Sequence, residues 1–229
     1  MKNCNPIQGN HLSRVAVFDL DGTLVAGDSF GKFLKWRITD SAARFFAALV
    51  TSPVWLVLLL CPRTRILGER CLIWLASAGL DSVAYEAVIY EFSIDHVASD
   101  KSSSSQDAIS RLREYRANGY RVLVVTACAE PLATAVCQAA QIHGVEVIAS
   151  TLTRTVWGFP RNMCVVRGEN KPRALEAVGV DLPVDHAYSD SWSDLPLLTS
   201  ARTPHLVAPS TRDLARFKRV FGERVDVLS

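Results

Sequence analysis

Two aspartates separated by a single leucine follow a short apolar run near the start of the chain. The stretch reads VAVFDLDGT, Val15–Thr23, and its acids are Asp19 and Asp21. Carboxylates at positions i and i+2 of an extended chain point the same way, and like charges held together need a divalent cation or a shared proton. The spacing therefore predicts a carboxylate pair at the end of a buried strand.

Five further residues have the chemistry to work with that pair. Asp190 and Asp194 add carboxylates, and oxygen-only ligands suit Mg²⁺, which often also binds a substrate phosphate. Thr126 offers a hydroxyl, and the amide of Ala127 precedes a predicted helix whose N-terminus favours an anion. Lys171 supplies a compact positive charge. Together these groups can hold a phosphoryl group while its charge redistributes.

The two aspartates of the pair could then divide the reaction between them. With a metal screening its charge, one aspartate can attack phosphorus and form an aspartyl-phosphate. The other can protonate the leaving oxygen and later activate water.

Alternating strand and helix patterns predict an α/β fold in which a Rossmann-like parallel sheet has helices on both faces. Such a sheet carries its site at the carboxyl ends of its strands, which is where Asp19, Thr126 and Asp190 fall. The region 151–166 resembles an irregular hairpin. Strands are predicted at 14–19, 120–127, 145–150, 186–190 and 203–208, and helices at 106–119, 130–144, 169–179, 193–201 and 210–219.

The 229 residues, 49% of them hydrophobic, suffice for one core and an elaboration. Residues 28–99 are helical in pattern and strongly apolar, and Asp28 and Asp81 are plausible N-caps. The run DKSSSSQ is a polar break, so we expect a boundary near Asp100. The predicted division is a catalytic core of residues 1–27 and 100–229 and a helical cap of residues 28–99, inserted after the first strand.

Composition argues against several other classes. A formal net charge of +2 gives no electrostatic footprint for nucleic acid, so we expect no nucleic-acid partner. The six cysteines form no close pair and no Cys/His cluster, which favours reduced thiols in a cytosolic protein over disulfides or zinc. Residues 1–14 lack the apolar core of a signal peptide.

Four stretches, DLDGT, VVTA, GENKPRALE and YSDSWSDLPLL, resemble in order the four motifs of the haloacid dehalogenase superfamily, over Val15–Leu198. The resemblance implies that Asp19 is the nucleophile and a metal ligand. It implies that Asp21 is the general acid/base and gives its backbone carbonyl to Mg²⁺. Dehalogenases proper do not need this second aspartate, which therefore points to a phosphatase or a phosphotransferase.

The same resemblance assigns the remaining site residues. It implies that Thr126 and Lys171 bind the phosphate, that Asp190 is a metal ligand and that Asp194 orients the metal shell. Arg161, on the predicted hairpin, and Arg167, between that hairpin and the third motif, either contact substrate phosphate or face water.

Other stretches, among them DLDGTLVAGDSFGKFL, PVWLVLLL and HLVAPSTRDL, look like the bacterial phosphatidylglycerophosphatase C group. That group belongs to the subclass, IB, whose helical cap lies between the first two motifs. Phosphoserine phosphatases share the subclass, but their fourth motif is of the Gly-Asp-Gly-Ala-Asn-Asp type, whereas Ser189–Asp194 reads SDSWSD. They also use a glutamate near the position of Asp28. Asp28 could take the place of that glutamate.

These resemblances imply a Mg²⁺-dependent phosphomonoester phosphatase acting on a membrane lipid phosphate such as phosphatidylglycerophosphate. Three alternatives stay open. They are a soluble small-molecule phosphatase, for instance on phosphoserine, a phosphotransferase that passes the phosphoryl group to an alcohol, and a non-catalytic membrane-binding adaptor that retains the fold.

The most hydrophobic part of the chain is Phe45–Cys61, inside the predicted cap. Motif one precedes it and the other motifs follow, so a single membrane crossing would separate Asp19 from Thr126. A second crossing would have to use Ile66–Leu80, which charged residues interrupt and which is too short. With Pro53 in the middle of the run and arginines on both sides of it, we expect a helical hairpin that enters one leaflet and returns. A buried helix of a larger cap and an oligomer contact are the alternatives.

Basic residues on both sides of the apolar run (Arg37, Arg44, Arg63 and Arg65) favour the cytoplasmic face, where they meet anionic headgroups. The expected location is cytoplasmic, peripheral on the cytoplasmic face of the inner membrane, with the cap on the membrane surface. The sequence leaves the oligomeric state open.

Overall fold

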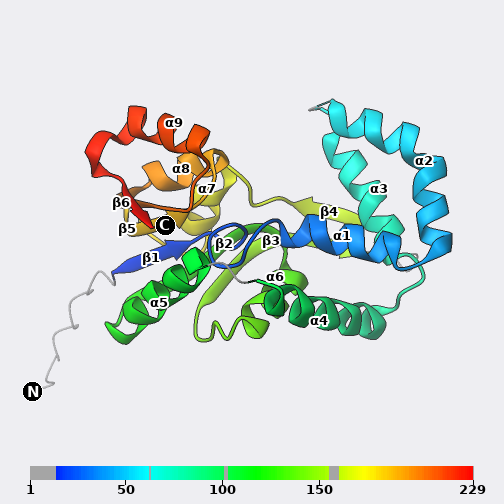
Figure 1. Ribbon diagram of the computed structural model, residues 1–229, viewed down its shortest axis with the longest axis horizontal. Helices are drawn as coiled ribbons and strands as arrows, with labels where there is room; N and C mark the ends of the chain where they lie inside the picture. Colours follow the sequence, from blue (N-terminus) through cyan, green and yellow to red (C-terminus); the bar gives the residue numbers. More distant parts are fainter. Residues whose placement is uncertain (1–13, 62, 101–102, 155–159, 229) are drawn as a thin grey trace, which may run out of the picture.

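A computed structural model describes residues 14–61, 63–100, 103–154 and 160–228 of the protein. Its centre is a seven-stranded sheet in the order β4-β3-β2-β1-β5-β6-β7 (Figure 1). Neighbouring strands are parallel except for the antiparallel pair β3 and β4. The strands are β1 Val15–Phe18, β2 Arg121–Ala129, β3 Glu146–Arg154, β4 Pro160–Cys164, β5 Val184–Ser189, β6 Ala201–Val207 and β7 Asp226–Leu228.

Apolar side chains alternate across the sheet and fill a core on each face. In β1, Ala16 and Phe18 belong to one buried cluster, and Val15 and Val17 belong to the other. The first cluster includes residues of α5 (Ser103–Ala117) and α6 (Glu130–Ala139), and the second includes residues of α7 (Asn170–Ala177), α8 (Leu195–Thr199) and α9 (Thr211–Phe221). Helices thus cover both faces, and the predicted α/β fold is confirmed.

Among the described residues five helices lie between β1 and β2 in the chain: α5, which packs on the sheet as described above, and before it α1 Ser29–Thr39, α2 Ala42–Leu60, α3 Arg65–Ser77 and α4 Ser82–Ala98. Both predicted N-caps are present, because Asp28 accepts a hydrogen bond from Gly31 N–H and Asp81 accepts one from Ala84 N–H. α4 packs against α6, whereas α2 and α3 pack on each other and extend away from the sheet (Figure 1). We call these two helices the α2–α3 hairpin.

α2 is one continuous helix through Pro53. Proline has no N–H to donate to the carbonyl four residues earlier, which belongs to Leu49. The hydroxyl of Ser52 donates to that carbonyl instead, at 2.7 Å, and so satisfies the acceptor that proline leaves open. The hairpin expected within Phe45–Cys61 is therefore wrong, because the chain does not turn at Pro53. The chain reverses after Leu60 instead, so the helical hairpin consists of α2 and α3.

Several details differ from the sequence-based expectations; α6, for example, ends at Ala139 rather than at residue 144. β2 does not end at Ala127, as predicted, but continues to Ala129, because the pairing with β3 resumes after a register shift. The serine run was expected to be a break between helices, but α5 begins at Ser103, so most of the run is helical. The short edge strand β7 was not expected. The turn 155–159 of the irregular β-hairpin predicted at 151–166 and the segment 1–13 lie outside the described residues.

Candidate active site

The carboxyl ends of β1, β2 and β5 lie side by side in the sheet and open into a cleft with a cavity volume of about 410 Å³. All seven residues that the sequence singles out for catalysis, phosphate binding or metal binding lie in the wall of this one cleft. The described lining consists of Asp19, Asp21, Gly22, Gly27, Asp28, Thr126, Ala127, Arg167, Lys171, Asp190, Ser191, Ser193 and Asp194.

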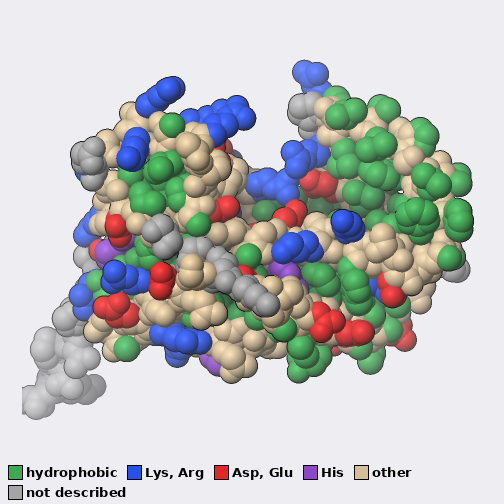
Figure 2. Space-filling model, in the orientation of Figure 1, with side chains coloured by type: hydrophobic (Ala, Val, Ile, Leu, Met, Phe, Trp, Pro, Cys, Tyr) green, Lys and Arg blue, Asp and Glu red, His purple; other side chains and the backbone are tan. Residues whose placement is uncertain are grey.

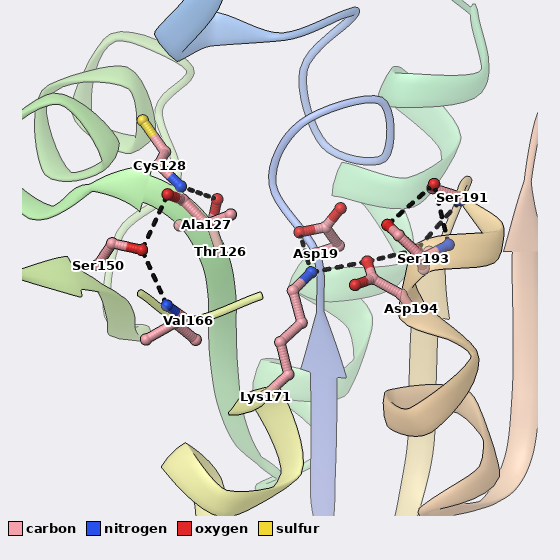
Figure 3. Close-up of polar contacts among 11 residues, drawn as sticks. Asp19, Thr126, Ala127, Cys128, Ser150, Val166, Lys171, Ser191, Ser193 and Asp194 are labelled. Carbon is pink, nitrogen blue, oxygen red and sulfur yellow. Dashed lines mark hydrogen bonds and ion pairs between the residues drawn. The ribbon is translucent and has the colours of Figure 1, made fainter. Parts of the chain in front are cut away.

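Lys171 joins two of the carboxylates. Its ammonium group donates to Asp19 Oδ1 at 2.7 Å and to Asp194 Oδ2 at 2.6 Å, and the Ser189 hydroxyl donates to the same Asp194 oxygen (Figure 3). Lys171, Asp19 and Asp194 are buried. Burial by itself would lower the pKa of Lys171, but the two carboxylate charges outweigh it and raise that pKa. The lysine therefore stays charged and fixes the two acids in place.

Asp19 lies where it can present its carboxylate to the cleft. Its backbone N–H donates to the carbonyl of Tyr188 in β5, which continues the sheet pairing up to the site. Burial raises the pKa of Asp19, the charge of Lys171 opposes this, and the carboxylate of Asp194 adds to it. Two carboxylates around one ammonium leave this part of the cleft with an excess of negative charge, which a cation would balance.

The second aspartate has different partners. Asp21 Oδ1 accepts a hydrogen bond from the Ser29 N–H at 2.9 Å, and the Ser29 hydroxyl shares a hydrogen bond of 3.0 Å with His96 Nε2. Burial raises the pKa of Asp21, although its hydrogen bonds to Ser29 oppose the shift. A raised pKa suits an acid that must carry a proton before it donates one. The different partners of Asp19 and Asp21 favour separate roles over a shared proton.

Asp190 carries the feature that points to a cation. Its Oδ1 is buried and has no hydrogen-bond partner in the described part of the protein, and burial raises the pKa of this carboxyl to about 6. A Cβ added at Gly22, where φ is +80°, would collide with the same carboxylate, so a glycine is needed for this close approach.

These observations fit Mg²⁺. Among the described residues, no three His, Cys, Asp or Glu side chains are grouped as metal ligands. The donor set that fits has only two side chains, the carboxylates of Asp19 and Asp190, with the backbone carbonyl of Asp21. Mg²⁺ commonly takes its remaining ligands from water and substrate phosphate, so a set of this size is sufficient.

Short polar contacts hold Thr126 and the residues that follow it at the end of β2. The Thr126 hydroxyl oxygen accepts the Cys128 N–H at 3.0 Å, which leaves its hydrogen free to face an anion. Ser150 of β3 donates to the Ala127 carbonyl and accepts the Val166 N–H, both at 2.9 Å (Figure 3). One hydroxyl therefore ties the last part of β2 to the segment that leads to Lys171.

Cys128 lies two residues after Thr126, so its thiol can be compared with that of a reactive cysteine. Burial raises the pKa of the Cys128 thiol well above its usual range, which fits a packed thiol rather than a nucleophile. The five cysteines in the described residues are free thiols.

The structure adds residues that sequence reasoning did not select. Ser29 and His96 support Asp21, Ser150 supports Ala127, and Glu69 of α3 contacts Arg167 at 3.2 Å. No local pattern could have identified them, because Ser29 and His96 are 67 positions apart and Glu69 and Arg167 are 98 apart. Only the packing of the helices between β1 and β2 brings these pairs together.

Comparisons with known proteins agree with this fold. Protein CicA of Caulobacter vibrioides is 27% identical over 198 residues, which cover 83% of this chain and 84% of CicA. A Bordetella pertussis Tohama I protein of unknown function has a similar structure, with a TM-score of 0.72, 21% identity and coverage of 95% of this chain and 99% of that one.

A substrate-bound phosphoserine phosphatase gives a TM-score of 0.54 at 13% identity, covering 94% of this chain and 91% of that one. Structural similarity to proteins that are 13% and 21% identical in sequence shows that the chain shares their fold. The family model for haloacid dehalogenase-like hydrolases matches residues 16–199, which is most of the chain. The chain therefore belongs to the haloacid dehalogenase-like hydrolase family.

Proposed function

We propose that the protein is a Mg²⁺-dependent phosphatase that hydrolyses phosphomonoesters through an aspartyl-phosphate on Asp19. The observation that carries the proposal is the position of Lys171, which lies between Asp19 and Asp194 in a cleft also lined by Thr126. The family match and the structural likeness to phosphoserine phosphatase support this class of reaction.

In this proposal the chain's own groups divide the work. Asp19 attacks phosphorus, while the Thr126 hydroxyl, the Ala127 amide and Lys171 bind the non-bridging oxygens. Asp21 donates a proton to the leaving oxygen and then accepts one from the water that cleaves the acyl phosphate. Mg²⁺, when held by Asp19, Asp190 and the Asp21 carbonyl, supplies positive charge that offsets the repulsion between substrate phosphate and the acids.

The test is a phosphomonoester panel with Mg²⁺ in detergent, applied to the wild type and to Asp19→Asn. The wild type should release phosphate and form a covalent phosphoprotein that hydroxylamine cleaves, and Asp19→Asn should do neither. Asp213→Asn, a surface change on α9, is the matched control and should behave as the wild type. Turnover by Asp19→Asn in a clean preparation would remove Asp19 as the nucleophile.

For the substrate we propose a membrane lipid phosphate, as expected for the phosphatidylglycerophosphatase C group of subclass IB. The support is the surface of α2. This helix is long and apolar enough to cross a membrane, with a mean hydropathy of 1.9. Only 6% of its apolar stretch is buried inside the protein. Its exposed large side chains are Phe45, Phe46, Leu49, Val50, Val54, Leu56, Val57 and Leu60. In Figure 2 apolar side chains cover much of the lobe that the α2–α3 hairpin forms.

We further propose that this surface lies in the cytoplasmic leaflet of a bacterial inner membrane containing anionic lipid. α3 and α4 together resemble a second span only as a pair bent by 96°. A single crossing by α2 would place Asp19 and Thr126 on opposite sides, although both line one cleft. Peripheral insertion avoids that conflict. Arg44, in the first turn of α2, and Arg65, the first residue of α3, add positive charge that an anionic surface attracts.

Flotation with vesicles tests this part independently of catalysis. The full chain should float with vesicles containing anionic phospholipid and much less with purely zwitterionic ones. Recovery at the bottom of the gradient with both would contradict membrane docking. Rates on lipid and soluble phosphomonoesters, with and without detergent, then test the lipid substrate.

A soluble phosphatase of the phosphoserine type is the second candidate, and one observation favours it. Asp28 lines the cleft, where its carboxylate could meet the ammonium of an amino-acid substrate. Faster turnover of phosphoserine than of lipid phosphate, lost in Asp28→Asn, would select this candidate.

Product analysis with added acceptor alcohols tests phosphotransfer, which transfers the phosphoryl group to the alcohol in place of water.

A further inference from the structure

The cleft has two cations in its described lining, and they differ in their surroundings. Lys171 is buried and already contacts Asp19 and Asp194. Arg167 lies toward solvent, with 44% of its side chain exposed, and its guanidinium contacts Glu69 of α3 at 3.2 Å. The charge of Lys171 is therefore committed to the reacting centre, whereas that of Arg167 lies at the entrance.

Glu69 does not neutralise this entrance. Its Oε1 accepts Nη1 of Arg167 at 3.2 Å and Nε of Arg65 at 3.1 Å, so one carboxylate oxygen serves two guanidinium groups. The trio has a formal charge of +1. A guanidinium has five N–H donors, and each of these contacts to Glu69 uses one. Arg65 is 58% exposed, so both cations retain donors that a ligand can reach.

The chain fixes Arg167 relative to the reacting centre. The preceding residue, Val166, donates its N–H to the Ser150 hydroxyl, and the Arg167 carbonyl accepts the Asn170 N–H as the chain turns into α7. Lys171 follows in the first turn of that helix. The buried cation and the exposed one are thus four residues apart on one short turn, and both line the same cleft. In Figure 2 blue side chains gather at the hollow beside the α2–α3 hairpin.

From this arrangement we propose a second anion-binding subsite, formed by Arg167 with the support of Glu69 and Arg65. It takes a second negatively charged group on a substrate whose phosphomonoester lies against Asp19, and in the lipid phosphate proposed above that group is a phosphodiester. The inference rests on the proposed phosphatase activity and narrows its substrate class. Because Glu69 and Arg65 belong to the α2–α3 hairpin, the same subsite connects the apolar surface of that hairpin with the cleft.

The test compares two soluble substrates that share a three-carbon phosphomonoester. The first has a free hydroxyl at the other end, and the second has a methyl phosphodiester there. The wild type should show a lower KM for the second. Arg167→Gln should raise KM for the diester-bearing substrate about tenfold more than for the hydroxyl-bearing one, with kcat for both within twofold, since the lost contacts are charge-assisted hydrogen bonds. Arg167→Lys should recover part of the preference.

Arg161→Gln is the matched control, because Arg161 is an exposed arginine of β4 outside the cleft lining and its loss changes the net charge equally. Its kinetics should match the wild type on both substrates. Equal KM changes on both substrates in Arg167→Gln, or the same changes in Arg161→Gln, would overturn the subsite. Wild-type inertness toward both substrates would instead contradict the proposed phosphatase function.

The lipid and soluble sources of the second anion are separated by one further comparison. A short-chain diacyl lipid with a phosphodiester and a terminal phosphomonoester is supplied as monomers and in anionic vesicles. A lipid source predicts a rate increase on vesicles that Arg167→Gln diminishes. A soluble source predicts that the preference for the diester is complete with monomers and unchanged by vesicles. Both results keep the subsite, and loss of the diester preference in every format removes it.

Discussion

The Ser29 hydroxyl at the start of α1 and Nε2 of His96 near the end of α4 are 3.0 Å apart, and both residues are buried. The same serine donates its backbone N–H to Asp21, so a residue of α4 reaches the proposed acid/base through one intermediate side chain. Burial lowers the pKa of His96, with the charge of Lys32 adding to the effect, which keeps the ring neutral at pH 7.

Ser29→Ala and His96→Ala should each destabilise the protein by about 1–2 kcal/mol, because each leaves a buried polar partner unsatisfied. The double variant should cost less than the sum of the two, because the second change removes a partner that the first has already left alone. Urea unfolding of the four proteins measures the coupling. Strict additivity would show that the hydrogen bond contributes nothing.

Lys171→Met should abolish most activity and destabilise the protein by about 3–5 kcal/mol near neutral pH, because it leaves Asp19 and Asp194 buried without their counter-charge. The pKa of Asp19, which burial already raises, should rise further in the variant. A raised carboxyl pKa favours the folded state at low pH and loses that contribution as pH rises through the folded-state value. The deficit should therefore shrink toward pH 5, as followed by denaturation at several pH values. Lys218→Met, on the surface of α9, should show no such pattern.

The raised pKa of Asp190 predicts that the stability of the metal-free protein depends on pH. Its folded-state pKa of about 6 lies above the ordinary value of 3.8, so its contribution to stability is present below about pH 4 and is lost as pH rises to about 6. In chelator, wild type should therefore become less stable relative to Asp190→Asn across this window.

Added Mg²⁺ should reverse that order at pH 8, because only the wild type then gains a ligand for the buried charge. Thermal unfolding of both proteins, with chelator and with Mg²⁺, gives the measurement. A parallel response of the two proteins to Mg²⁺ would place the metal elsewhere.

Gly22 and Gly119 offer a matched pair, since both have positive φ, +80° and +77°. A Cβ at Gly119 meets nothing within 4 Å, whereas one at Gly22 would collide with Asp190. Gly119→Ala should cost about 1 kcal/mol and retain activity. Gly22→Ala should cost more and lower kcat about 100-fold, because a shift of about 1 Å in a catalytic group has that effect. Assays of unfolding and turnover on both variants decide the matter, and equal behaviour would show that the approach to Asp190 is unimportant.

Much of the core could be predicted because its signals are local. The valines of β1 and β2 mark buried strands, and Asp28 and Asp81 mark the helix starts, since each effect acts within a few residues. The rule that parallel strands gather their carboxyl ends then placed the site residues in one cleft, although their roles stay predictions.

The rest depends on contacts that no local pattern reveals. β2 continues past Thr126 because β3 offers partners there, and β7 exists because β6 leaves an edge that three residues can pair with. The contacts of His96 with Ser29 and of Glu69 with Arg167 depend on where whole helices pack. A pattern identifies an exposed charge and a buried one, but it does not say which distant charge each will meet.

Val50 of α2 and Val83 of α4 are exposed to nearly the same extent, 77% and 78%. Membrane docking through the α2–α3 hairpin predicts different results when each becomes glutamate. Val50→Glu should reduce flotation with anionic vesicles at least tenfold, because it places a charge in the apolar layer and opposes the anionic surface. Val83→Glu carries the same charge change outside the hairpin and should float nearly as the wild type. Both variants should keep their activity on a soluble phosphomonoester, because neither residue lines the cleft. Equal losses of flotation would attribute binding to net charge, and loss of soluble activity in Val50→Glu would attribute its effect to misfolding.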